Sequence, residues 1–153
     1  MKLILGRFLP YRLNVLAQVV AEGLGRIYAK RFGFGIPEWR IIALLGESEE
    51  MTARDVGVHT RMHKTKVSRA TAALEQRGLI ERRANERDRR EAFLSLTVDG
   101  RAVYAQVVPI ALTYAGQLTD GIPAEELATF ERVIEILMQR SGISVDTPPE
   151  MDM

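Results

Sequence analysis

The sequence predicts a mainly α-helical protein with one small β-hairpin, and three observations support this. Apolar residues recur at helical spacing in long stretches near both ends of the chain. Between these stretches lie two shorter helical segments joined by a tight turn. Two alternating segments, LIERRA and AFLSLT, then flank the charged loop NERDRRE, which is typical of two strands and their connection.

The first long stretch covers about residues 8–31, and Gly33 and Gly35 follow it. Pro37 then stands where the first turn of a helix tolerates proline, so IPEWRIIALLGE is expected to form a second helix. The next segment, GESEE, is interpreted as a polar turn. We expect four side chains of the second helix to face partly inward: Trp39, Ile42, Ala43 and Leu45.

The central segment has the signals of two helices separated by a turn. Thr52 is a candidate N-cap, with Asp55 in the capping-box position, for the helix TARDVGVH. A turn at about 60–63 precedes a helix over 64–76, and Gly78 stands where a left-handed residue ends a helix. The inward positions of that helix are expected to be Val67, Ala70, Ala73 and Leu74.

Asp99 opens a further long helix to about Leu118, which Pro109 should kink because proline lacks a backbone donor. After the break at 121–123, the segment 124–140 is again amphipathic. The last residues, 146–153, are expected to form a flexible tail.

Positive charge is concentrated in the middle of the chain. Residues 61–90 contain ten basic and four acidic residues, a net charge of +6, whereas the whole chain carries +1. Residues 119–153 carry −6. A dense positive segment over helix and hairpin signals is what binding to the phosphate backbone of double-stranded DNA requires.

Composition excludes several classes of function. The chain has no cysteine, so it has no disulfide, thiolate metal site or thiol-based peroxide sensor. With only His59 and His63 as histidines, we expect no metal and no cofactor. No catalytic or phosphate-loop motif is present, so an enzyme is not predicted. No segment is long and apolar enough to enter a membrane, and we expect a soluble, cytoplasmic protein.

The broad apolar stripes of the terminal helices need a partner, and a second copy of the chain is the simplest one. We therefore assign residues 1–35 and 99–145 to a helical dimerisation region, and residues 36–98 to a DNA-binding domain. A two-fold dimer would place two recognition helices about 34–36 Å apart, in successive major grooves of a near-palindromic operator.

The chain resembles the MarR family of winged helix-turn-helix regulators. The resemblance rests on HKTKVSRATAALEQRGLIERR, on DRREAFLSLT (88–97) and on Gly100 at the head of the following helix, and the order of elements matches over about 8–140. Two residues depart from the family pattern. Gly57 replaces the usual alanine, and His63 replaces an acidic residue or asparagine at the turn.

The resemblance implies a DNA-binding face at the start of the second helix and on the hairpin, or wing. It assigns Arg89 to the minor groove, whose negative potential favours an inserted arginine. Asp88 is expected to hold the wing by pairing with a nearby arginine. For Thr52, a phosphate contact and a plain N-cap remain alternatives. For the other candidate residues, the alternative is a solvated surface that makes no DNA contact. The predicted DNA-binding residues are Thr52, His63, Lys64, Thr65, Lys66, Ser68, Arg69, Arg87, Arg89 and Arg90.

The resemblance also implies release from DNA by a small ligand, such as an aromatic acid or its thioester. Aromatic rings and the forked N–H groups of an arginine could bind such a ligand, although the favoured alternatives are a core residue for Trp39 and a surface or ion-paired residue for Arg40. The function so predicted is a homodimeric, sequence-specific transcriptional regulator, in the usual case a repressor. The alternative is a winged-helix module that binds proteins without specific DNA binding. The candidate ligand residues are Tyr11, Arg12, Trp39, Arg40 and Tyr104.

Overall fold

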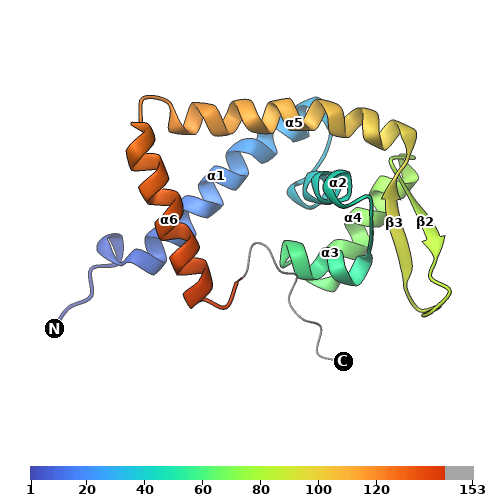
Figure 1. Ribbon diagram of the computed structural model, residues 1–153, viewed down its shortest axis with the longest axis horizontal. Helices are drawn as coiled ribbons and strands as arrows, with labels where there is room; N and C mark the ends of the chain where they lie inside the picture. Colours follow the sequence, from blue (N-terminus) through green and yellow to red (C-terminus); the bar gives the residue numbers. More distant parts are fainter. Residues whose placement is uncertain (144–153) are drawn as a thin grey trace.

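The computed structural model describes residues 1–143, so the predicted tail (146–153) lies outside the described residues. Six α-helices and a small antiparallel sheet follow one another along the chain, as Figure 1 shows. The predicted class, mainly helical with a hairpin wing, is confirmed. In chain order the elements are a 3₁₀ turn η1 (Leu5–Arg7), α1 (Leu9–Phe32), α2 (Ile36–Ser48), β1 (Glu50–Thr52), α3 (Ala53–Thr60), α4 (Lys64–Gln76), β2 (Ile80–Ala84), β3 (Ala92–Leu96), α5 (Val98–Thr119) and α6 (Ala124–Arg140).

The core lies where α2 packs against α4, α5 and the sheet. Its fully buried side chains include Ile42, Leu45 and Leu74, which the sequence predicted to face inward. Trp39 and Ala43 are only partly buried, also as predicted. Four other fully buried residues were not predicted from the sequence: Tyr28, Phe34, Ile41 and Thr71.

The sheet has three strands in the order β1–β3–β2, not the two strands that the sequence predicted. The prediction of a polar turn at GESEE was wrong at both ends. α2 continues to Ser48, and Glu50 already begins β1, where it pairs with Ser95 of β3. Only Glu49 turns the chain, at φ 63° and ψ −61°. A strand of three residues is too short to show alternation, and so it left no signal in the sequence.

Two tyrosines fasten α1 to α5. The buried Tyr28 hydroxyl donates to the carbonyl oxygen of Val107 over 2.9 Å, and Tyr114 donates to the carbonyl oxygen of Val20 over 2.8 Å. Burial raises the pKa of the Tyr28 phenol, which keeps it protonated as a donor. α5 runs on through Pro109, and Thr97 caps its start by accepting from the Gly100 amide at 3.0 Å.

The two ends of α5 serve different parts of the molecule. Figure 1 shows the sheet and α4 at one end of α5, and α6 turning back from the other. Across α6, all of which the structure describes, no side chain is buried, although Phe130, Val133 and Ile136 are large and apolar. Within residues 1–143, no helix combines the length and apolarity needed to cross a membrane.

Candidate nucleic-acid interface

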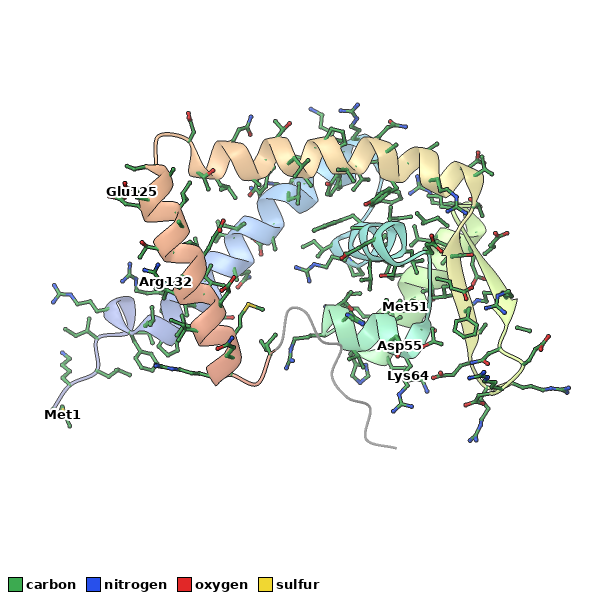
Figure 2. All side chains as sticks on the ribbon, viewed as in Figure 1. Met1, Met51, Asp55, Lys64, Glu125 and Arg132 are labelled. Atoms are coloured by element: carbon green, nitrogen blue, oxygen red, sulfur yellow. The ribbon has the colours of Figure 1, made fainter. Side chains whose placement is uncertain are left out.

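The start of α4 presents the predicted polar face to solvent. Lys64, Thr65, Lys66, Ser68 and Arg69 are all exposed, as Figure 2 illustrates for the labelled Lys64. Val67 and Ala70 point the other way and are buried, as expected. The helix therefore divides into an apolar face that anchors it and a polar face of hydroxyls and cations. Such side chains can reach phosphates and base edges.

His63 is the N-cap of α4. Its Nδ1 accepts a hydrogen bond from the Thr65 amide at 3.2 Å. The ring must then carry its proton on Nε2, so that an N–H donor points away from the cap. His63 thus keeps the capping role of the acidic residue or asparagine that it replaces, and adds a donor at the edge of the exposed face.

The turn between α3 and α4 is tight. Arg61 takes a left-handed conformation at φ 54°, and the Met62 amide donates to the carbonyl oxygen of Gly57 at 3.2 Å. A Cβ on Gly57 would meet its nearest neighbour, the Met62 carbonyl oxygen, at 3.4 Å, which is ordinary contact. The turn therefore does not require glycine at this position.

The wing loop is shaped by two side chains that accept from backbone amides. Asn85 Oδ1 accepts from the amides of Arg87 (3.1 Å) and Asp88 (3.3 Å), and Asp88 Oδ1 accepts from the Arg90 amide (3.0 Å). Asp88 also lies 3.5 Å from Arg90 Nε, in line with the predicted structural role. Asn85 was not predicted, although an asparagine directly after a strand is a recognised turn signal. Arg87, Arg89 and Arg90 remain exposed.

Besides Arg90, three of the ten central basic residues are engaged within the protein. Arg82 is ion-paired with Glu75. Arg83 makes a two-pronged ion pair with Glu50, with Nη2–Oε1 at 2.7 Å and Nε–Oε2 at 3.2 Å. The hydrogen bond from Arg83 to Glu50 and the nearby negative charge raise the pKa of the guanidinium.

Arg77 is the third: it donates to the Phe32 carbonyl oxygen at 2.7 Å and lies over the Phe34 ring. The charge count of the sequence therefore overstates the number of cations that are free to meet phosphates.

Thr52 is 6% exposed, and its hydroxyl accepts from the Asp55 amide at 3.1 Å. This is the N-cap geometry, and it leaves little of the side chain accessible to a phosphate. The neighbouring Arg54 is exposed.

A hollow of about 630 Å³ lies between α3, α4 and the base of the wing. Arg54, Lys64 and Arg90 line it together with the hydroxyl-bearing Ser68, and Glu91 is the one acidic residue in the lining. Two of the three elements that form the walls, α4 and the wing, are those that the sequence assigned to DNA binding. A concave surface whose charged residues are mostly positive suits a polyanion.

The five candidate ligand residues do not form one cluster within the chain. Tyr11 and Arg12 lie in the first turn of α1, whereas Trp39 contacts Tyr28, seventeen residues further along α1 and thus about 25 Å away. Arg40 lies over the Trp39 ring, with its Cζ 5.9 Å from the ring centre. Tyr104 packs against Gly46 of α2. Trp39 Nε1 is buried without a hydrogen-bond partner among the described residues.

Known proteins share this arrangement. Residues 32–91 match the sequence model of the MarR family. The fold matches a MarR/EmrR family transcriptional regulator from Acinetobacter sp. ADP1 with a TM-score of 0.82, covering 92% of this chain and 99% of that one at 24% identity. The fold and the segment 32–91 are therefore similar to those of MarR-family transcriptional regulators.

The curated relatives that the chain resembles include transcriptional regulators and a repressor. Two relatives show how the similarity is distributed. The HTH-type transcriptional regulator YwoH of Bacillus subtilis is 22% identical over 88% of this chain and 96% of its own length. The homoprotocatechuate degradative operon repressor of Escherichia coli is 28% identical, over 58% of this chain and 60% of its own length.

Proposed function

We propose that this protein is a DNA-binding transcriptional regulator of the MarR type, a homodimeric repressor that binds a near-palindromic operator and is released from it by a small ligand. The observation that carries the DNA-binding part is the hollow between α3, α4 and the wing. It is flanked by the exposed face of α4 on one side and by the arginines of the wing on the other.

In this proposal α4 enters the major groove. Thr65, Lys66, Ser68 and Arg69 face base edges and phosphates there, with His63 and Lys64 at the edge of the groove. Arg89 enters the neighbouring minor groove, while Arg87 and Arg90 contact phosphates. Asp88 and Asn85 hold the loop that carries these arginines. Arg54 supports a phosphate contact better than Thr52 does, since the Thr52 hydroxyl is occupied as a cap.

The dimer is supported by the exposed apolar side chains of the helical ends. Leu9 and Leu16 on α1, Leu112 on α5 and Phe130 on α6 are each about half exposed or more, far from the core of the winged module. An isolated chain would leave this surface in water, and a second copy would cover it. We assign residues 1–35 and 99–145 to this association and 36–98 to DNA binding.

The proposed ligand is an aromatic acid or its thioester. The support is chemical: Trp39 offers an aromatic face and an unpartnered Nε1 donor, and Arg40 lies beside it. One relative, the E. coli repressor, is named for a degradative operon. A ligand of this kind can release DNA only to the extent that it binds the DNA-free arrangement more tightly than the DNA-bound one.

The deciding experiment is fluorescence anisotropy with a duplex from upstream of the protein's own coding sequence, compared with random duplex over a salt series. We expect tight, salt-sensitive binding to the first and weak binding to the second. Absence of binding to either duplex at low salt would reject the proposal. It would favour the alternative, a winged-helix module that binds proteins.

A further inference from the structure

The wing and the helix-turn-helix are joined by a side-chain bridge that crosses the middle strand of the sheet. β2 and β1 are not neighbours, because β3 lies between them. Arg83 of β2 stands opposite Phe93 of β3, and its guanidinium lies over the Phe93 ring, with Cζ 4.7 Å from the ring centre. It then reaches Glu50 of β1 with two hydrogen bonds, at 2.7 and 3.2 Å.

The bridge connects two parts that have different roles in DNA binding. β2 leads directly into the wing loop at 85–91, which contains Arg89. Glu50 lies two residues before Thr52, which caps α3 and so begins the helix-turn-helix. A change in the angle between β2 and β1 therefore moves the wing relative to α4.

This geometry matters because, in the proposed function, the wing and α4 bind different grooves of the same duplex. Two binding elements act together only if their separation matches the spacing of their sites. We propose that Arg83 is a positioning residue: its ion pair with Glu50 fixes the angle between the wing and the helix-turn-helix, and so sets the distance from Arg89 to the exposed face of α4. The inference rests on the proposed use of both elements on DNA.

The alternative role for Arg83 is a direct phosphate contact, and Glu50→Gln separates the two roles by the sign of its effect. If Arg83 contacts phosphate, removing a negative charge beside it frees the cation, and DNA binding strengthens. If Arg83 positions the wing, the same change breaks the bridge and weakens binding by about two- to fivefold, the range for one well-ordered exposed pair.

Glu81→Gln is the matched control. Glu81 faces Ser95 from β2 as Glu50 does from β1, so both lie on the same side of the sheet and carry the same charge. Among residues 1–143, Glu81 forms no ion pair. We expect Glu81→Gln to leave DNA binding unchanged or slightly tighter, as simple electrostatics predicts.

Two further measurements distinguish positioning from general destabilisation. In an Arg89→Ala background, Glu50→Gln should have a smaller effect on DNA binding, since the minor-groove contact of the wing is already gone and only the phosphate contacts of Arg87 and Arg90 remain to be misplaced. In the free protein, hydrogen exchange at β2 amides should be faster in Glu50→Gln than in the wild type or Glu81→Gln. The exchange measurement needs no DNA, so it tests the bridge even if the wild type fails to bind duplex and the proposed function falls.

The expected result is that Glu50→Gln weakens DNA binding, that this loss is smaller in the Arg89→Ala background, and that β2 amides exchange faster. Tighter or unchanged binding by Glu50→Gln would overturn the inference. An equal loss in the Arg89→Ala background, or unchanged exchange at β2, would overturn it as well.

Discussion

Arg77 joins the end of the recognition helix to the end of the first helix: its Nη2 donates to the carbonyl oxygen of Phe32 at 2.7 Å. The same guanidinium lies 4.6 Å from the centre of the Phe34 ring, which is itself stacked on Phe32. One side chain thereby ties α4 to the turn between α1 and α2, that is, the DNA-binding part to a helix assigned to dimerisation.

We expect Arg77→Ala to lower the free energy of unfolding by about 1 kcal/mol, because a charged hydrogen bond to a helix-end carbonyl and an aromatic contact are both lost. Urea unfolding monitored by circular dichroism would measure this. Arg69→Ala on the same helix is the control, since Arg69 is exposed; it should weaken DNA binding while leaving stability unchanged. Equal stability of the two variants would contradict a joining role for Arg77.

Gly100→Ala should destabilise the protein by about 3 kcal/mol or prevent folding, because an added Cβ would overlap the carbonyl oxygen of Leu79. The added Cβ and the Leu79 carbonyl oxygen are both attached directly to the backbone, so the overlap can be relieved only by moving the main chain. Gly57→Ala is the matched comparison, with its nearest neighbours at 3.4 and 3.6 Å. It should stabilise α3 by about 0.5–1 kcal/mol. Thermal unfolding of the two variants would test both the predicted loss of stability in Gly100→Ala and the predicted gain in Gly57→Ala.

His63→Asn should raise the free energy of unfolding by about 0.5–1 kcal/mol, since asparagine is among the strongest N-caps. His63→Asp should stabilise α4 similarly but weaken DNA binding, because it places a negative charge at the edge of the interface. Comparison of urea unfolding with duplex titration separates the two effects. Equal DNA affinities of the Asn and Asp variants would show that His63 lies away from the phosphate backbone.

Arg89→Ala should weaken operator binding by about 1–3 kcal/mol while leaving the dimer intact. Because one cation is lost from the interface, the slope of log affinity against log salt should become shallower. Anisotropy titrations at several salt concentrations, with sedimentation as the check on assembly, would measure both. Unchanged affinity in a correctly folded dimer would remove the wing tip from the mechanism.

Val133→Glu should dissociate the proposed dimer, because it places a charge on the exposed apolar face of α6. Ala128→Glu is the control: positions 128, 131 and 135 share one helix face, which already carries Glu131 and Glu135. Analytical ultracentrifugation would give the mass of each variant. A monomeric wild type, or a dimer that survives Val133→Glu, would place the association elsewhere.

The sequence alone determined the elements whose signals are local. Helical spacing and a helix-ending glycine defined α4 at Lys64–Gln76, and alternation defined both strands of the wing. Thr52 and its spacing to Asp55 predicted a cap that the structure contains. These features depend on neighbouring residues only, so they are readable without a fold. The exposed side of α4 could also be predicted from the sequence, because Val67, Ala70 and Leu74 define the opposite, buried side.

Tertiary structure decided which charges are free and which elements meet. Arg77, Arg82 and Arg83 look like their neighbours in the sequence, yet each is held by a partner from another element. β1 is too short to show a pattern and exists because β3 supplies its hydrogen bonds. Tyr11 and Trp39 are separated because a helix of 24 residues holds its ends apart. Pairings between distant segments depend on how the chain packs, and no local pattern in the sequence records them.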